Sequence, residues 1–159
     1  MYKRLVSLIL LFIITSQQTV LASPITFEDC MTQLNNEIQK DIKKSFPLLE
    51  QFEGANNAQS YNYNDISKMI LNSGKRNKQI ESLMALFYGT SIGDRELIVM
   101  NNDIEKATSG YLFYKELNGT NVLLEIKKEE KSWKVINKRK VQGKYVTLEQ
   151  INKECVKKH

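Results

Sequence analysis

The order of helical and extended patterns in this sequence predicts an α+β domain. Apolar residues recur at helical spacing as far as Phe87, β-compatible runs follow between Leu97 and Val141, and helical spacing returns at Leu148. Elements segregated along the chain in this way are typical of the α+β class, in which helices pack on an antiparallel sheet. We therefore expect N-terminal helices on an antiparallel sheet of three to four strands, followed by a C-terminal helix.

Ahead of these elements, residues 1–23 have the pattern of a secretory signal peptide. A short positive segment precedes an apolar run over residues 5–15, and small residues follow at Ala22 and Ser23. The apolar run is shorter than the roughly 20 residues that a membrane-spanning helix needs, so a cleaved leader is favoured over a membrane anchor. We expect residues 24–159 to form a single α+β domain, periplasmic or secreted, without stable membrane insertion.

The first helix is predicted to begin at Phe27. Thr26 stands three residues ahead of Asp29, which is the spacing of a capping box, and apolar residues then recur at helical spacing up to Ile42. Pro47 should end this helix, because the residue before a proline disfavours the α conformation.

The chain between Pro47 and Phe87 is predicted to alternate helical turns with loops. One further turn is expected over residues 48–52, and the polar segment Ala55–Asn64 shows no helical or strand period and predicts a loop. Apolar residues return at helical spacing from Ile66, with a break around Ser73 and Gly74, so two helices or one kinked helix are expected.

The sheet is predicted from four β-compatible runs. Asn118–Gly119 joins the second and third runs and favours a type I′ turn, because Asn and Gly tolerate positive φ at both central positions. Thr147 can cap a final helix that carries Leu148, Ile151 and Cys155. The four runs are Leu97–Met100, Tyr111–Leu117, Val122–Ile126 and Trp133–Val141.

Cys30 and Cys155 are the two cysteines of the chain, and both follow the predicted leader. An exported protein meets an oxidising environment, and an even number of cysteines suggests pairing. The alternatives are a metal site, for which no further cysteine or histidine lies nearby, and two free thiols. The sequence therefore predicts a disulfide between Cys30 and Cys155 that joins the first helix to the last.

The segment from Lys127 to Lys140 is the most basic part of the chain, with seven Lys or Arg residues, two Glu and one Trp. Trp133 falls on the opposite side of its strand from Lys134 and Lys138, because side chains alternate along a strand. A nucleic-acid platform needs stacking aromatics on the same face as its basic residues. Removing the leader also lowers the formal net charge of +5 by two. We therefore expect a solvated sheet face here, and no nucleic-acid partner.

The end of the predicted sheet resembles a known family. Val122–Ile126, a charged turn, and Lys131–Ile136 with its Trp-Lys-Val triplet are similar to the closing hairpin of nuclear-transport-factor-like domains. This resemblance covers Tyr111–Val141 and implies helices ahead of a curved antiparallel sheet. The final helix with Cys155 departs from the family pattern, which usually ends in a strand, and a cystatin-like helix-on-sheet arrangement fits the same elements. Enzymes and binding domains share these folds, so the resemblance does not imply an activity.

Residues for catalysis are scarce. The sole histidine is His159, the last residue, where a catalytic base would lack an orienting partner, so neither a Ser–His nor a Cys–His arrangement is expected. Glycine-rich phosphate loops are absent, and we expect no cofactor or metal. Paired carboxylates are the remaining enzymatic option, although each pair lies beside a helix start, a turn or a basic residue that explains it structurally. These pairs are Glu28 with Asp29, Asp94 with Glu96, Asp103 with Glu105, and Glu129 with Glu130.

The sequence favours an exported, non-enzymatic binding protein that acts on a protein partner in the cell envelope. The most concrete version is an immunity-type inhibitor of a toxic enzyme. Tyr61, Tyr63 and Asp65 are the candidate contact residues, because tyrosine offers a rigid ring and a hydroxyl at interfaces. Two alternatives stay open: a carboxylate-based hydrolase, and a small-ligand or accessory domain with a pocket lined by aromatic residues. The aromatic residues of that pocket would be Tyr111, Phe113 and Trp133.

Overall fold

The computed structural model describes residues 26–52, 55–72, 77–147 and 149. The predicted signal peptide lies outside the described residues, as do Leu148, Ile151 and Cys155 of the predicted final helix.

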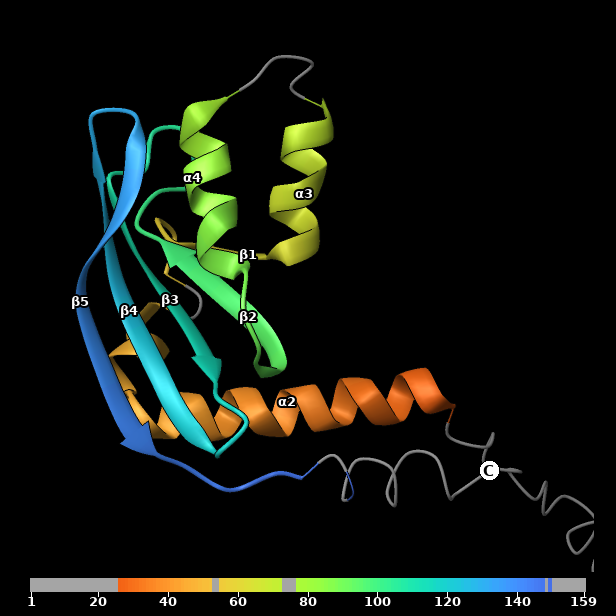
Figure 1. The fold of residues 1–159 in the computed structure, drawn as a ribbon. Coiled ribbons are helices and arrows are strands. Elements are labelled where there is room, and N and C mark those ends of the chain that lie inside the picture. Colours follow the sequence, from red (N-terminus) through yellow and green to blue (C-terminus); the bar gives the residue numbers. More distant parts are fainter. Residues whose placement is uncertain (1–25, 53–54, 73–76, 148, 150–159) are drawn as a thin grey trace, which may run out of the picture.

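One antiparallel sheet of five strands forms the centre of the described structure, with the strands side by side in chain order (Figure 1). The α+β class is therefore confirmed, whereas the prediction of three to four strands is wrong. The strands are β1 (Gln59–Asn62), β2 (Ile92–Val99), β3 (Ser109–Lys115), β4 (Thr120–Glu129) and β5 (Ser132–Gln142).

The additional strand is β1, which lies within the segment predicted to be a loop. Tyr61 of β1 pairs with Leu97 of β2, and the Tyr61 side chain is buried while the other three residues of the strand are exposed. With one apolar residue in four, β1 is too short to show a period of two in the sequence. Its pairing is decided by the partner strand β2.

Four helical segments surround the sheet in the described part of the chain. A capping box begins α2, as predicted: the Asp29 N–H donates to Thr26 Oγ1 at 3.1 Å, and the Thr26 N–H donates to Asp29 Oδ2 at 3.1 Å. A separate pair of helices follows β1, which settles the choice between two helices and a kinked one. The segments are α2 (Phe27–Ser45), the 3-10 helix η1 (Pro47–Phe52), α3 (Tyr63–Asn72) and α4 (Lys78–Phe87).

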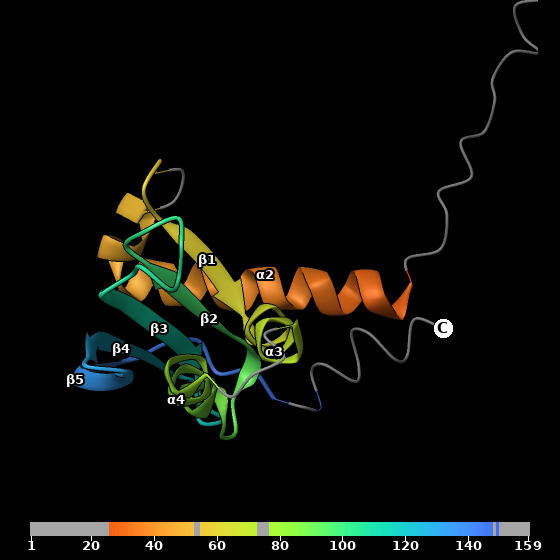
Figure 2. The same ribbon diagram turned by 90° about the horizontal axis from the view of Figure 1, so that it is seen from above.

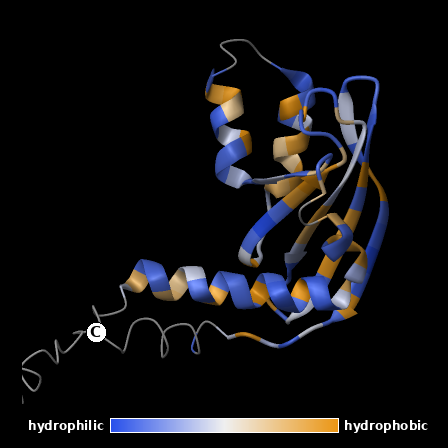
Figure 3. Ribbon diagram, turned by 180° about the vertical axis from the view of Figure 1, so that it is seen from behind, coloured by the Kyte–Doolittle hydropathy of each residue, from blue (hydrophilic) through white to orange (hydrophobic). Residues whose placement is uncertain are grey.

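Both faces of the sheet are covered by helices, so there are two hydrophobic cores. On one face α3 and α4 bury Leu112, Val122 and Trp133, while on the other α2 and η1 bury Phe113 and Leu123. Figures 1 and 2 show α2 crossing the sheet, with its N-terminal end extending past it. Hydrophilic residues dominate the outer surface of α2 and the edge strand β5 (Figure 3).

The β3–β4 turn differs from the predicted type I′ turn. Glu130 is the one described non-glycine residue with positive φ, so Asn118 does not adopt the conformation that a type I′ turn requires. Instead, the Gly119 N–H donates to the Glu116 carbonyl at 2.9 Å, and Gly119 has a φ of 84°. This is a three-residue loop closed by a glycine bulge, which the same Asn-Gly dipeptide also permits.

The basic strand β5 is exposed along its length after Trp133. Trp133 is 4% exposed and belongs to the core beneath α4, and its backbone N–H donates to Ser82 Oγ at 2.9 Å. Alternation along the strand predicts that Val135 faces the core beside Trp133, but Val135 is 42% exposed. Lys134 Nζ lies 2.7 Å from Glu129 Oε2, so part of this charge is neutralised locally.

A buried polar cluster links the end of β3 and the start of β4 to α2 through hydrogen bonds. Lys115 of β3 is fully buried, and its Nζ donates to Asp41 Oδ2 at 2.6 Å and to the Lys144 carbonyl at 3.1 Å. Asn121 Nδ2 donates to the same carboxylate oxygen at 2.9 Å. A Cβ added at Gly143 would collide with Asp41 Oδ2 and Asn121 Nδ2, so the chain leaving β5 can approach α2 this closely only with glycine at this position.

Candidate functional site

The most irregular part of the sheet is the start of β2. Ile92 pairs with Lys115 of β3, and the next paired residue, Glu96, lies opposite Phe113, so three residues of β2 face Tyr114 alone. We call these three residues, Gly93–Arg95, the β2 bulge. On the other side of β2, β1 ends at Asn62 opposite Glu96, which leaves the bulge without a strand partner there. Bulges of this kind re-aim side chains and are common beside functional sites.

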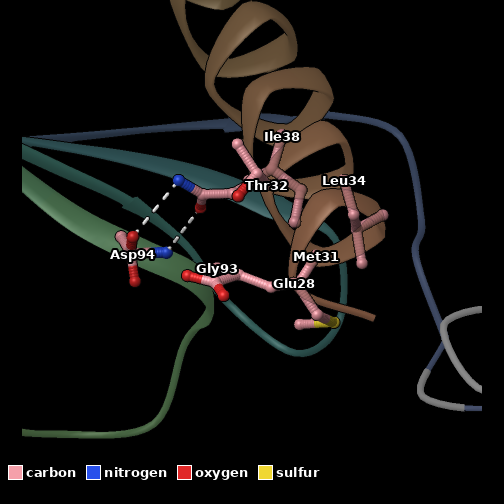
Figure 4. Close-up of a pocket in the computed structure, with 8 residues that line it drawn as sticks. Glu28, Met31, Thr32, Leu34, Ile38, Gly93 and Asp94 are labelled. Atoms are coloured by element: carbon pink, nitrogen blue, oxygen red, sulfur yellow. Dashed lines mark hydrogen bonds between the residues drawn. The ribbon is translucent and has the colours of Figure 1, made fainter. Parts of the chain in front are cut away.

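The bulge is held against α2 by amide groups. The Asp94 N–H donates to Asn35 Oδ1 at 2.8 Å, and Asn35 Nδ2 donates back to Asp94 Oδ2 at 3.2 Å (Figure 4). Gln39 Nε2 donates to the Asp94 carbonyl at 3.0 Å. Gly93 has a φ of 69°, and an added Cβ would lie 2.8 Å from Asn35 Oδ1. Both the left-handed backbone and the close approach of α2 therefore require glycine at this position.

Arg95 ends the bulge and points toward α4. Its guanidinium carbon lies 4.0 Å from the centre of the Tyr114 ring, and Nη1 donates to the Leu86 carbonyl at 2.9 Å. The side chain is partly buried, and burial lowers the pKa of Arg95, an effect that the nearby Tyr114 opposes. Gly89, with a φ of 119°, makes room for this group, because a Cβ there would lie 2.7 Å from Nη2.

Three open hollows meet at the start of β2, and each has one exposed apolar side chain in its wall. The α2–β2 hollow of about 360 Å³ includes Met31, the α3–β2 hollow of about 270 Å³ includes Tyr63, and the hairpin hollow of about 380 Å³ includes Leu117. These side chains are 36%, 45% and 51% exposed. Gly93 and Asp94 line the first two hollows, and Arg95 lines the last two. We call the bulge with these three hollows the bulge surface.

The structure separates the three contact residues predicted from the sequence. Tyr63 is exposed at the start of α3 and lines the α3–β2 hollow beside Arg95. Tyr61 is 9% exposed and belongs to the core under α3 and α4, where burial raises the pKa of its hydroxyl. Asp65 accepts the Asn62 N–H at 2.9 Å and so caps α3. Of the three, Tyr63 alone is placed for contact with a partner, while Tyr61 and Asp65 have structural roles.

Sequence reasoning did not identify Arg95, Met31 or Leu117 as site residues. A glycine inside a strand pattern often marks a bulge, but Gly93 lies ahead of the predicted run Leu97–Met100 and falls within β2 only in the structure. Nothing in the linear sequence shows that Met31 and Leu117 lie beside that bulge, because the first comes from α2 and the second from the β3–β4 turn.

The four carboxylate pairs have local structural partners. Asp29 belongs to the cap of α2, and its hydrogen bonds with Thr26 lower the pKa of its carboxyl. Asp94 binds Asn35, and Asp103 lies 3.1 Å from Lys106 Nζ. Glu129 pairs with Lys134, whose hydrogen bond and positive charge lower the carboxyl pKa. Glu28 and Asp94, which come from different pairs, both line the α2–β2 hollow, where Asp94 is held by Asn35.

The aromatic residues proposed for a ligand pocket do not share one face of the sheet. Tyr111 and Phe113 lie on the α2 side, where the ring centres of Tyr111 and Phe52 are 5.7 Å apart in a stacked arrangement. Trp133 lies on the opposite side, beneath α4. The two faces are filled by helices, so these rings act as core residues.

Within the described residues, no three His, Cys, Asp or Glu side chains gather as a metal site would require. None of the helices seen in the described ranges combines the length and apolar character needed to cross a membrane. Comparison of the chain with protein-family models, with curated proteins and with solved structures found no match.

Proposed function

We propose that this chain is an exported binding protein that recognises a protein partner through the bulge surface and does not turn over a substrate. The observation that supports this proposal is the gathering of Met31, Tyr63, Leu117 and Arg95 around three adjoining open hollows. Tyrosine, methionine and arginine are the residue types enriched at the centres of protein–protein interfaces. Open hollows with protruding apolar side chains suit a protein surface better than an enclosed small ligand.

The most concrete form of this proposal is an immunity-type inhibitor of a toxic enzyme in the cell envelope. The predicted leader would place the mature chain with its target, and the small size and predicted disulfide would suit a stable stoichiometric inhibitor. Such an inhibitor needs a rigid surface rather than catalytic groups. The bulge surface is built on a sheet that is fixed by helices on both faces.

We further propose that the C-terminal segment forms the predicted helix and that Cys155 bonds to Cys30. The Lys144 N–H donates to Asp41 Oδ2 at 3.0 Å, so the chain leaving β5 starts beside the C-terminal half of α2. Asp41 lies 11 residues after Cys30, and Cys155 lies 11 residues after Lys144. Residues 144–147 are not helical, so this stretch and a helix that begins after Thr147 and runs antiparallel to α2 would together carry Cys155 back toward Cys30.

Capture of the partner from an envelope extract tests the proposed interface. We expect Tyr63→Ala and Met31→Ala each to weaken capture about tenfold or more, as is typical for a central interface residue. Leu71→Ala and Ile136→Ala are matched controls, because both side chains are exposed, at 77% and 50%, but line none of the three hollows.

Two results would overturn this proposal. If the Tyr63 and Met31 variants captured the partner as well as the controls do, the bulge surface would not be the interface. If the purified protein converted a substrate and carboxylate variants abolished that conversion, the protein would be an enzyme.

A further inference from the structure

Arg95 is a partly buried cation that has no carboxylate partner among the described residues. The described contacts of its guanidinium are the Leu86 carbonyl at Nη1 and the face of the Tyr114 ring. Its Nε is buried without a hydrogen-bond acceptor, and none of the described contacts gives Nη2 an acceptor. The buried Lys115, by contrast, has the Asp41 carboxylate at 2.6 Å.

This arrangement leaves the charge of Arg95 incompletely compensated. Taking a cation out of water is costly unless an anion or a full set of hydrogen bonds replaces the water. One carbonyl and one aromatic face supply part of that replacement, and they also tie the end of α4 to the sheet. That structural role uses one N–H of Nη1 and the flat face of the guanidinium, so the second N–H of Nη1 and the N–H groups of Nη2 have no described acceptor.

The space beside Arg95 is open on two sides. Arg95 lines both the α3–β2 hollow and the hairpin hollow. The neighbouring acids are already engaged, since Asp94 binds Asn35 and Glu116 Oε1 lies 2.6 Å from Lys140 Nζ. The α3–β2 hollow also has the amide side chain of Asn64 in its wall, which can donate to an anion, whereas the Ser91 hydroxyl already donates to the Gly93 carbonyl at 3.3 Å.

We propose that Arg95 is a carboxylate-binding residue, and that its free guanidinium edge receives an Asp or Glu side chain of the protein partner. A guanidinium matches the two oxygens of a carboxylate with parallel hydrogen bonds, which a lysine cannot do. The source of the carboxylate rests on the proposed function. The site itself does not, because it can be tested with a small carboxylate.

The test is an NMR titration of the purified protein with sodium acetate, with sodium chloride at matched ionic strength as the reference. The arginine Nε–Hε resonances report on each guanidinium separately. Arg139 is the matched control, because it also lies over an aromatic ring, at 5.7 Å from the centre of Phe46, but on the exposed strand β5. We expect acetate to shift the Arg95 resonance and the Ser91 amide along a saturating curve while the Arg139 resonance follows the chloride reference.

Variants then distinguish the contribution of the paired guanidinium donors from that of the positive charge alone. Arg95→Gln should lose the saturating shift of the Ser91 amide, and Arg139→Gln should retain it. Arg95→Lys keeps a positive charge at this position and is therefore a milder change than Arg95→Gln. It should weaken acetate binding about tenfold, because the parallel pair of donors is lost. A folded Arg95→Lys variant that binds acetate as tightly as the wild type would contradict the assignment.

The remaining outcomes are equally decisive. Equal, non-saturating shifts at Arg95 and Arg139 would overturn the proposal, and so would saturation with inorganic phosphate but not with acetate. If acetate does not bind at Arg95 but Tyr63→Ala still impairs capture of the partner, the Arg95 site is rejected and the proposed function is retained. Saturable acetate binding together with unimpaired capture by Tyr63→Ala would support the Arg95 site and reject the proposed interface.

Discussion

Single buried polar residues decide how the sheet is joined to α2. Asp41 accepts hydrogen bonds from Lys115, Asn121 and the backbone of Lys144. Burial acts to raise the pKa of the Asp41 carboxyl, but these hydrogen bonds outweigh it and hold the pKa below its ordinary value of 3.8. The charged form of Asp41 is therefore the form that stabilises the fold.

Asp41→Asn should lower the free energy of unfolding by about 3–5 kcal/mol at pH 7, because the substitution leaves Lys115 buried without a counter-charge. A folded-state pKa below the unfolded value gives stability that is present above the unfolded pKa and lost as the pH falls through the folded pKa. The difference between wild type and Asp41→Asn should therefore shrink below about pH 4. Urea denaturation at several pH values measures both effects.

The control for this prediction is Glu37→Gln. Glu37 pairs with Lys40 at 3.3 Å, but both side chains are largely exposed, so the loss should stay below about 1 kcal/mol. Equal losses in the two variants, or a difference at Asp41 that does not change with pH, would contradict the role given to the buried pair.

Trp133 is the largest side chain joining β5 to the core beneath α4. Trp133→Ala should cost about 3–5 kcal/mol, because it leaves a large cavity in that core. Trp133→Phe should cost less, since most of the ring volume remains and the indole N–H, which has no described acceptor, is removed. Thermal or urea unfolding measures the series, with the exposed Val135→Ala as control. A water-like Trp emission maximum and an unchanged Trp133→Ala stability would place this side chain at the surface.

At the scale of elements, the sequence predicts helices better than strand edges. The first helix was predictable in its start, face and end, because a cap, a long helical period and Pro47 all agree. The short strand β1 was not, because its pairing depends on the register with Leu97 and not on its own composition. The β3–β4 turn was placed correctly but given the wrong type, because Asn-Gly is compatible with two loop lengths.

The β2 bulge depends on the backbone of Gly93. Gly93→Ala should lower the free energy of unfolding by about 1–3 kcal/mol, since alanine disfavours positive φ and its Cβ would crowd Asn35. The same substitution should weaken capture of the partner, because the bulge cannot keep its shape. Urea denaturation and capture from envelope extract measure these effects, with Ser91→Ala as the control for stability. A fully stable Gly93→Ala variant with normal capture would show that the bulge is dispensable.

The predicted link between α2 and the last helix is a disulfide between Cys30 and Cys155. Intact mass measurement of protein prepared from the envelope should give a mass two hydrogens below that of the dithiol form. Closing so long a loop can stabilise a fold by roughly 4–5 kcal/mol in the chain-entropy model, so reduction should lower the melting temperature. Two thiols that react with an alkylating agent under native, non-reducing conditions would exclude the bond.

At the scale of the whole molecule, the layered arrangement determines where a partner can bind. Helices cover both faces of the sheet, so a partner can reach the sheet itself only at its edges and at its irregular positions. Strand β5 is one such edge, and its exposed lysines oppose edge-to-edge pairing. The start of β2 is the position where α2, α3 and the β3–β4 turn all contribute exposed apolar side chains.

Only part of this surface could be predicted from the sequence. Tyr63 was identified because a tyrosine-bearing polar segment had no periodic explanation, and Tyr61 satisfied the same criterion although it faces the core. A shift of one residue along a strand moves a side chain from one face of the sheet to the other. The pairing of β1 with β2 sets this register and so decides that Tyr61 faces the core. Arg95 could not be identified, because its lack of a carboxylate partner is a property of three-dimensional contacts.

The central claim is that a protein partner binds at the bulge surface. Amide hydrogen exchange of the chain, with and without its captured partner, tests this claim most directly, because it reports on every part of the surface at once. We predict slower exchange in the complex at residues 90–95 and at the start of α3, with little change along residues 134–142 of β5. Protection confined to β5, or unchanged exchange over residues 90–95 in a saturated complex, would contradict the claim.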